Sequence, residues 1–242
     1  MDNIIFITGA SSDIGQALIK NIKEECIIIA HYNNNEKRLL ELQKEIKNKI
    51  IPIQADFSIE SSIEMMLNKI ENEIGTPSKI IHLAAPKFEN IRFKDINWNR
   101  FENEIVVSLK SIIQILHSFL PKLAKMNGGR VIVMLSSVTL GVPPKALTQY
   151  TTAKYALLGL MKALASEYAD KKITVNCISP SMIETQFLSL INERIVELSA
   201  ESHPLKRNAN VFDVVPSILM LMSDDAAYIT GVNIPITGGS KF

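Results

Sequence analysis

Short, wholly apolar segments alternate with longer helical patterns along the whole chain, and this alternation constrains the fold more than any other feature. The short segments are rich in β-branched residues. They are apolar throughout, which is typical of strands buried on both faces of a parallel sheet. Seven segments are predicted to be strands: Ile4–Thr8, Cys26–His31, Ile50–Gln54, Lys79–Ala84, Arg130–Ser136, Ile173–Ile178 and Val232–Pro235.

Helical patterns fill the gaps between these strands. Strict alternation of strand and helix indicates right-handed βαβ crossovers and a doubly wound sheet. We therefore predict an α/β fold with a seven-stranded, mostly parallel sheet and helices on both faces. No repeat, low-complexity tract or linker is visible, so residues 1–242 are expected to form one domain. The predicted helices are Gly15–Glu24, Glu36–Lys47, Ile59–Ile74, Trp98–Met126, Tyr150–Ala169, Thr185–Ser199 and Phe212–Ser223.

Two of these helical segments, Trp98–Met126 and Tyr150–Ala169, carry more apolar surface than one helix face can use. A helix that is apolar all round must be buried all round. One side can pack on the sheet, whereas the other needs loops of the same chain or a second copy of it. We favour the second copy and expect a homodimer or homotetramer.

Composition excludes several classes of function. The formal charge is +1, so nothing in the overall charge favours binding to nucleic acid or a membrane surface. No apolar run is expected to approach the roughly 18 residues that span a bilayer, and a strand begins almost at once, so we expect a cytoplasmic protein. Cys26 and Cys177 lie in apolar, strand-like runs, which favours small core residues in a reducing compartment. No metal site is predicted.

A glycine-containing turn joins the first strand to the first helix. It reads Thr8-Gly9-Ala10-Ser11-Ser12-Asp13-Ile14-Gly15. Such a turn lets the backbone approach a pyrophosphate, whose charge meets free N–H groups and the positive helix end. The Ser11 and Ser12 hydroxyls add donors, whereas the Asp13 carboxylate would repel the anion unless it points away. A glycine pair after a strand can also simply make a tight turn.

The adenosine end is predicted from two strand ends. Asp56, followed by Phe57, comes after the third strand, where a carboxylate can accept a hydrogen bond from an adenine amino group or cap the next helix. An acidic residue after the second strand would bind a ribose 2′-hydroxyl, and its absence beside basic groups admits a 2′-phosphate. The stretch holds His31, Tyr32 and Asn33, with Lys37 and Arg38 beyond, so NADP(H) is favoured over NAD(H).

Tyr150 and Lys154 lie four residues apart at the start of a predicted helix, thirteen residues after Ser137. Residues at i and i+4 share a helix face, so the phenol and the ammonium can point into one cleft. Reduction of a carbonyl needs a proton donor at the oxygen while hydride reaches the carbon. A free tyrosine has a pKa of about 10, which a nearby ammonium lowers. The Ser137 hydroxyl can hold the substrate oxygen.

At this point the sequence resembles the short-chain dehydrogenase/reductase family in its single-domain branch, with an overall pattern similar to the 3-oxoacyl-acyl carrier protein reductases. The resemblance covers essentially the whole chain and implies a Rossmann-type fold. The matching pieces are Thr8–Gly15, Asp56, Ala84-Ala85, Ser137, Tyr150 with Lys154, Val175–Pro180 running to Thr185, and the tail from Pro204 to Gly239.

The resemblance implies a role for each matching residue. Tyr150 would be the general acid/base, Lys154 the cation that lowers its pKa and binds the nicotinamide ribose, and Ser137 the group that polarises the substrate carbonyl. The adenosine ribose side would be lined by Ala84 and Ala85. The nicotinamide end would be lined by Ile14, Pro180, Ile183 and Thr185.

This chain also departs from the family pattern. Leu83 and Pro86 replace members of an asparagine- and glycine-containing loop, and Pro86 lacks a backbone donor. Ser108 stands where the family has an asparagine that holds a water in its proton relay. Ser181 follows Pro180 in place of a glycine, and Asp13 replaces a loop glycine.

Two functions remain open on the sequence. The first is an NAD(P)-dependent oxidoreductase acting on a small carbonyl or alcohol, for example a 3-oxoacyl thioester. The second is a weakly active or inactive nucleotide-binding relative that serves as a regulatory or partner subunit. A substrate lid is expected at Met182–Asn210, where apolar side chains suit a lipophilic group or simply pack on the body.

Overall fold

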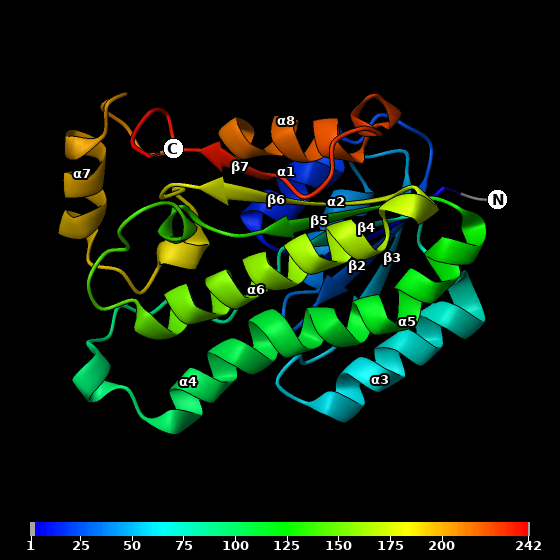
Figure 1. Ribbon diagram of the computed structural model, residues 1–242, viewed down its shortest axis with the longest axis horizontal. Helices are drawn as coiled ribbons and strands as arrows, with labels where there is room; N and C mark the ends of the chain where they lie inside the picture. Colours follow the sequence, from blue (N-terminus) through cyan, green and yellow to red (C-terminus); the bar gives the residue numbers. More distant parts are fainter. Residues whose placement is uncertain (1–2, 242) are drawn as a thin grey trace.

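The computed structural model describes residues 3–241 and contains the predicted sheet (Figure 1). Seven strands lie in the order β3-β2-β1-β4-β5-β6-β7, and every neighbouring pair is parallel. The order reverses between β1 and β4, the point at which such sheets leave a crevice at their carboxyl edge. The strands are β1 Ile4–Thr8, β2 Ile27–Tyr32, β3 Lys49–Gln54, β4 Lys79–His82, β5 Gly129–Met134, β6 Ile173–Pro180 and β7 Asn233–Ile236.

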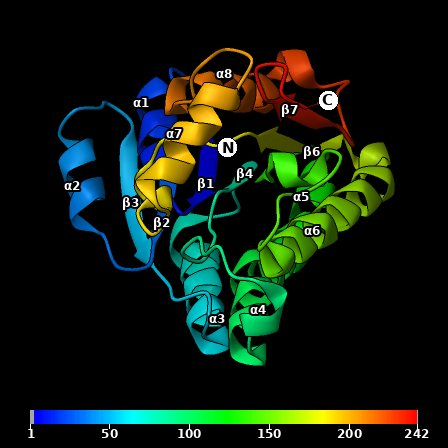
Figure 2. The same ribbon diagram turned by 90° about the vertical axis from the view of Figure 1, so that its left-hand side faces the viewer.

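Helices cover both faces of the sheet, as predicted. The apolar residues of α1, α2 and α8 pack in one core layer, and those of α3, α5 and α6 pack in the other. Figure 2 shows these two groups on opposite sides of the strands, and Figure 1 shows α7 at one end of the molecule. The helices are α1 Asp13–Asn21, α2 Lys37–Gln43, α3 Glu60–Lys69, α4 Trp98–Ile105, α5 Ser111–Met126, α6 Thr148–Glu167, α7 Glu193–Ser202 and α8 Val211–Met222. Short π or 3-10 segments are η1 Ile70–Ile74, η2 Phe93–Asp95, η3 Val106–Lys110, η4 Ser137–Thr139, η5 Ala169–Lys171, η6 Gln186–Leu188 and η7 Asp224–Ala226.

β1 illustrates why the strands are apolar throughout. Successive side chains of a strand point to opposite faces of the sheet. Ile4 and Phe6 therefore lie in the core layer beneath α5, while Ile5 and Ile7 lie in the layer beneath α1 and α8. A polar residue at any of these positions would be buried on one face or the other.

The predicted helix Trp98–Met126 is continuous but changes its winding. It runs from α4 through the π turn η3 into α5. By length and composition this run could cross a membrane, contrary to the expectation that no segment approaches that size. Ile112, Ile115 and Phe119 are fully buried in the core layer beneath the sheet. A buried core helix can have the same length and apolar composition as a membrane-spanning helix.

The segment between β6 and α8 differs from its prediction. One helix was expected over Thr185–Ser199, whereas the structure has the short turn η6 and then α7. The Asn192 side chain accepts a hydrogen bond from the Arg194 N–H and so starts α7 at Glu193. The N-cap at Asn192 therefore starts a separate helix within the segment that was predicted to be one helix.

Candidate active site

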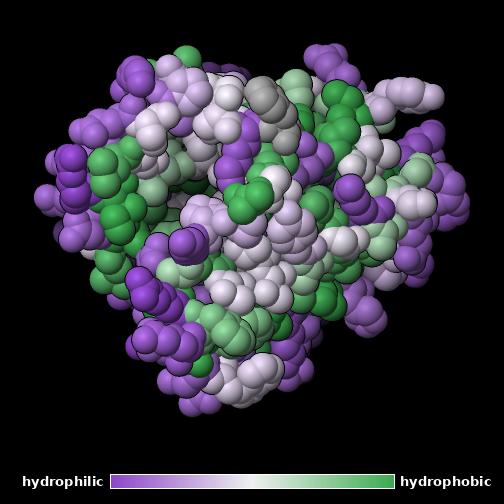
Figure 3. All heavy atoms as spheres, turned by 60° about the vertical axis from the view of Figure 1, so that its left-hand side comes forward, coloured by the Kyte–Doolittle hydropathy of each residue, from purple (hydrophilic) through white to green (hydrophobic). Residues whose placement is uncertain are grey.

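A cavity of about 650 Å³ opens at the carboxyl ends of β1, β4, β5 and β6. Figure 3 shows a hollow on this side of the molecule, with hydrophobic residues along part of its rim. The predicted site residues that line it are Ser12, Asp13, Ile14, Ala85, Ser137, Tyr150, Lys154, Pro180, Ile183 and Thr185. Residues from distant parts of the sequence therefore meet in one concave site.

The glycine turn is shaped by close backbone contacts. Gly9 has a φ of +65°, and a Cβ there would lie 3.0 Å from the Ala84 nitrogen. A Cβ on Gly15 would lie 2.5 Å from the Ala10 carbonyl oxygen. The Ser12 hydroxyl accepts from the Gly15 N–H and caps α1. The first N–H groups of a helix have no partner within it, and this helix start lines the cavity, so the loop fits an anionic group such as a pyrophosphate.

The Asp13 carboxylate is held by two partners. Its Oδ1 lies 2.5 Å from Arg38 Nη2, and its Oδ2 accepts from the Gln186 N–H at 2.7 Å. Arg38 also donates to the Ser11 carbonyl oxygen at 2.9 Å. The negative charge that argued against a phosphate site is therefore paired with a guanidinium. The same carboxylate joins the glycine turn to α2 and to the start of η6.

His31 lies beneath the glycine turn and does not line the cavity. Its Nδ1 accepts from the Gly9 N–H at 3.0 Å, so its Nε2–H must donate to the Ala55 carbonyl oxygen at 3.0 Å. Burial lowers the pKa of His31 to about 4. The ring stacks on Phe57 with centroids 4.0 Å apart. His31 and Phe57, both predicted to bind the cofactor, therefore support the glycine turn from the protein interior.

The other predicted adenosine residues lie outside the cavity lining, as do Gly9, Ser11, Gly15 and Ala84. Asp56 Oδ1 accepts from the Ser58 N–H and hydroxyl at 2.8 and 2.6 Å, which shapes the turn before α3. Asn33 is exposed and accepts from the Gln54 side chain through its carbonyl oxygen. Burial, and then a hydrogen bond with Glu36, raise the pKa of Tyr32. Glu36 is an acid close after β2 that the sequence argument overlooked.

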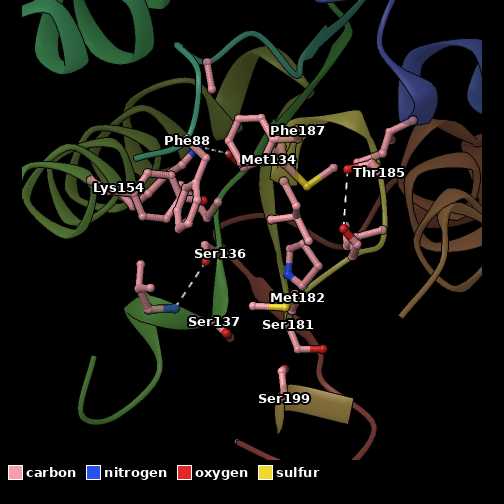
Figure 4. A pocket seen from close by; sticks show the side chains of 18 of the residues that line it. Phe88, Met134, Ser136, Ser137, Lys154, Ser181, Met182, Thr185, Phe187 and Ser199 are labelled. Atoms are coloured by element: carbon pink, nitrogen blue, oxygen red, sulfur yellow. Dashed lines mark hydrogen bonds between the residues drawn. The ribbon is translucent and has the colours of Figure 1, made fainter. Parts of the chain in front are cut away.

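Tyr150 and Lys154 lie on one buried face of α6, 9% and 3% exposed. Lys154 Nζ donates to the Met134 carbonyl oxygen at 2.9 Å (Figure 4). The same atom lies 5.5 Å from the centre of the Tyr150 ring. Phe88 packs edge-on against the tyrosine ring, with centroids 5.0 Å apart. The helix face therefore brings phenol and ammonium together, as the spacing predicts.

The expected lowering of the tyrosine pKa is absent. Burial raises the pKa of Tyr150 well above its usual value, the hydrogen bond with Ser136 opposes this, and the Glu104 charge adds to it. Burial also lowers the pKa of Lys154 to about 8. The reason is that the lysine is directed at the Met134 carbonyl and the tyrosine ring, while desolvation disfavours both charged forms.

Two serines follow β5, and they are placed differently. Ser137 lines the cavity and begins η4, and its carbonyl oxygen accepts from Lys241 Nζ at 3.4 Å. Ser136 also lines the cavity, accepts from the Val138 N–H at 3.4 Å, and its side chain lowers the pKa of Tyr150. Sequence spacing singled out Ser137 alone. The pair Ser136-Ser137 at a strand end was the available signal for the second hydroxyl.

Ser108 lies behind the cavity and is fully buried. Its carbonyl oxygen is 3.2 Å from His82 Nε2, and its hydroxyl donates to Glu104 Oε1 at 3.0 Å. His82 Nδ1 in turn contacts the Thr8 hydroxyl at 2.9 Å. Since that hydroxyl accepts from the Leu83 and Ala84 N–H groups, its proton is left for His82 Nδ1. This network links the end of β1 to the π turn η3.

Further cavity residues were not predicted as site residues. About half of them are apolar, and they come from α2, the ends of β4 and β5, the loop before α6, the segment after β6 and the C-terminal segment. Those after β6 fall largely in the predicted lid, Met182–Asn210. No motif marks the apolar ones elsewhere, because an apolar residue in a loop has the same signature as a core residue. They are Arg38, Leu83, Phe88, Met134, Leu135, Ser136, Val138, Pro144, Leu147, Ser181, Met182, Gln186, Phe187, Leu188, Ser199, Ser202, His203, Ser240 and Lys241.

Comparison with known proteins identifies the family. Residues 9–241 match the family model described as enoyl-(acyl carrier protein) reductase. The chain belongs to the short-chain dehydrogenase/reductase family. It is 27% identical to the 3-oxoacyl-[acyl-carrier-protein] reductase of Staphylococcus epidermidis, with 99% of each chain covered. It is 30% identical to nodulation protein G of Azospirillum brasilense over 99% of this chain and 98% of that protein.

Solved structures share the fold. The promiscuous reductase LugOII, which catalyses a keto-reduction, superposes with a TM-score of 0.88 at 22% identity, covering 98% of this chain and 97% of that chain. A gluconate 5-dehydrogenase from Burkholderia cenocepacia, in complex with NADP and tartrate, gives 0.88 at 16% identity, with 99% and 95% covered. These structures share the Rossmann-type sheet that the sequence predicts. The family model and the curated relatives show that the protein is an oxidoreductase of this family.

Proposed function

We propose that this short-chain dehydrogenase/reductase is an NAD(P)(H)-dependent carbonyl reductase formed by one domain, with Tyr150, Lys154 and Ser137 at its reaction centre. The observation that carries the proposal is the meeting of these three side chains with the start of α1 in one cavity. The nicotinamide cofactor, when bound, supplies the hydride. The chain itself supplies the proton, the orientation of the carbonyl and the electrostatic environment.

The proposed proton donor is the Tyr150 hydroxyl. Because burial raises its pKa, the phenol carries its proton across the neutral range, as a general acid for carbonyl reduction must. The Ser137 hydroxyl would hold the substrate oxygen. As negative charge develops on the phenol oxygen, the bond with Ser136 and the nearby Lys154 cation would stabilise it.

Binding of the cofactor is proposed at the start of α1. The loop residues Gly9 to Gly15 would approach the pyrophosphate, and the ends of β2, β3 and β4 would surround the adenosine. Pro180, Ile183 and Thr185 would face the nicotinamide end. We favour NADP(H) over NAD(H) because Arg38 lies in the cavity wall beside this loop, although Glu36 is an acid close by.

Arg38→Ala tests the cofactor preference. The variant also leaves the Asp13 carboxylate unpaired, so both cofactors should lose affinity. If the guanidinium binds a 2′-phosphate, NADPH should lose about tenfold or more beyond the loss for NADH. Lys44→Ala is a matched control, because that side chain is exposed at the far end of α2. Equal losses for both cofactors in Arg38→Ala would argue against the preference.

The proposed substrate is a small carbonyl compound with an apolar group, such as a 3-oxoacyl thioester. Phe88, Met182, Phe187 and Leu188 make the substrate side of the cavity apolar. Curated relatives named 3-oxoacyl-[acyl-carrier-protein] reductase support the thioester. Met182–Asn210 would act as the lid, because η6 and α7 border the cavity from one side.

We also propose a cytoplasmic homodimer or homotetramer. Ile113 of α5 and Tyr155 of α6 are 43% and 44% exposed, so an apolar surface remains on these helices. Cys26 and Cys177 are both free and buried, which suits a reducing compartment. Light scattering on the purified protein at several concentrations tests the assembly.

Tyr150→Phe tests the reaction centre. The ring packing against Phe88 is retained and only the hydroxyl is lost, so turnover should fall by a factor of about 10² to 10⁴. Nucleotide affinity should stay within a few-fold. Turnover is measured with NADPH and NADH against 3-oxoacyl thioesters, sugars and ketones. Unchanged rates in Tyr150→Phe would overturn the assigned role, and a wild-type protein that binds nucleotide without turnover would indicate a regulatory or partner subunit.

A further inference from the structure

α4 buries a single residue, and that residue is a glutamate. Within Trp98–Ile105, Glu104 is 7% exposed, while Trp98 is 68% exposed. Burial of a carboxylate is unfavourable unless it is hydrogen-bonded and paired with a cation. A helix that exposes its tryptophan and buries its glutamate inverts the usual pattern. This inversion points to a role for the carboxyl group other than packing.

The Glu104 carboxylate is oriented from its own helix. The Ser108 hydroxyl, four residues along and within the π turn η3, donates to Glu104 Oε1 at 3.0 Å. Ser108 is itself fixed, because it is fully buried and its carbonyl oxygen is 3.2 Å from His82 Nε2. The residue that replaces the family asparagine therefore holds a carboxylate.

Lys154 is a buried cation on α6, the helix that packs against α4. Burial raises the pKa of Glu104, whereas the Lys154 charge and the Ser108 hydrogen bond lower it. In the other direction, burial lowers the pKa of Lys154 to about 8, and Glu104 and, less strongly, Cys177 on β6 oppose this. Burial raises the pKa of Cys177 to about 12, so this thiol is neutral and Glu104 is the charged partner. The two buried groups therefore stabilise each other's charged form.

The remaining titratable groups around Glu104 come from three elements. Tyr150 on α6 is neutral, and the Glu104 charge helps to keep it so by raising its pKa. His82 on β4 is also neutral, since burial lowers its pKa to about 3. Glu89, in the segment after β4, raises the pKa of Glu104 but is itself paired with Arg100 at 3.4 Å. Among these groups, Lys154 is the cation buried with Glu104.

We propose that Glu104, held by Ser108, is the positioning residue that keeps Lys154 protonated and thereby sets the pH range in which Tyr150 donates its proton. The proposal rests on the function assigned above to Tyr150 and Lys154. The carboxylate acts through the lysine and the tyrosine and does not itself contact substrate.

Glu104→Gln isolates the charge. The amide has nearly the same shape and still accepts from the Ser108 hydroxyl, so only the negative charge is lost. Removing that charge lowers the pKa of Lys154 and of Tyr150, because it raises both in the native protein. Reduction needs both protons. The alkaline limb of kcat/KM for carbonyl reduction should therefore move down by about one pH unit or more.

Glu102→Gln is the matched control, since Glu102 is exposed on the same helix. Its alkaline limb should coincide with that of the wild type. A purely structural role for Glu104 would lower the rate equally at every pH and leave the limb in place. That outcome would overturn the proposal.

A melting experiment tests the pair without turnover. Glu104→Gln and Lys154→Met each leave one buried charge alone, whereas the double variant leaves none. The double variant should therefore melt well above the temperature expected from adding the two single losses. Strictly additive losses would overturn the pairing. If the wild type shows no turnover with any substrate, the proposed function fails. The melting experiment then tests the interaction of Glu104 with Lys154 by itself.

Discussion

Thr8 and Thr174 are two buried strand threonines whose hydroxyls have opposite environments. The Thr8 hydroxyl accepts from the Ala84 N–H at 3.2 Å and from the Leu83 N–H at 3.1 Å, and it contacts His82 Nδ1 at 2.9 Å. Thr174 is 4% exposed, and its hydroxyl has no hydrogen-bond partner among the described residues. Replacement of each by valine should therefore have opposite effects on stability.

The magnitude for Thr8→Val follows from the groups left without partners. The Leu83 N–H also donates to the Thr8 carbonyl oxygen, so it keeps one bond. The Ala84 N–H and His82 Nδ1 lose theirs, at about 1–3 kcal/mol each. The added methyl group offsets about 1 kcal/mol. The net loss should be about 1–5 kcal/mol, or a fall of roughly 2–20 °C in Tm for a chain of this size.

Thr174→Val removes a hydroxyl that makes no hydrogen bond. The free energy of unfolding should stay unchanged or rise by about 1 kcal/mol, because an unpaired buried polar group is replaced by a methyl. Both variants are compared by urea denaturation at one protein concentration, with equal m-values required before the free energies are compared. If Thr8→Val proves as stable as the wild type, or Thr174→Val the less stable of the two, the hydrogen-bond argument is refuted.

Two further predictions concern the glycine turn and acid stability. Gly15→Ala places a methyl group 2.5 Å from the Ala10 carbonyl oxygen, so the turn must move. Nucleotide affinity, measured by titration calorimetry, should fall about tenfold or more. Gly128→Ala, where a methyl group meets nothing within 4 Å, should bind nucleotide as the wild type does, and equal affinities for the two variants would contradict the prediction. Burial lowers the pKa of His31 to about 4 and of His82 to about 3, from the ordinary 6.5, so their stabilising contribution is complete above pH 6.5 and is lost as pH falls from there toward 4 and 3. The free energy of unfolding should therefore fall between pH 6.5 and 4.5. In His82→Gln it should fall less over the same range, and a fall as large as that of the wild type would contradict the role of His82.

Much of the fold follows from the sequence because the strands are buried on both faces. Ile4–Thr8 was predicted with both its ends correct, and all seven strands occur in the predicted places. Helix ends were less predictable. The Asn192 side chain caps α7 and starts that helix at Glu193, whereas α6 begins at Thr148, two residues before the predicted Tyr150, with no side-chain cap.

The site was predictable where chemistry depends on local spacing. The i, i+4 spacing of Tyr150 and Lys154 places both on one face of any helix. The environment of those side chains was not predictable, because it depends on residues distant in sequence. Burial raises the pKa of Tyr150 where a lowered value was expected. Nothing in the polar pattern of Trp98–Ile105 marks Glu104 as its buried member.

The Asp13 carboxylate contacts two neighbouring parts of the cavity wall. It binds Arg38, beside the loop proposed to hold the nucleotide phosphates, and the Gln186 N–H, in the segment that borders the proposed substrate side. Arg38 also contacts the Gln186 side chain at 3.5 Å. A ligand that binds the Arg38 guanidinium weakens these contacts and so changes how the segment at Gln186 is held. Thermodynamic linkage then requires the reverse effect with equal strength. Binding of nucleotide should therefore change the affinity for substrate, with Asp13 and Arg38 as the coupling residues.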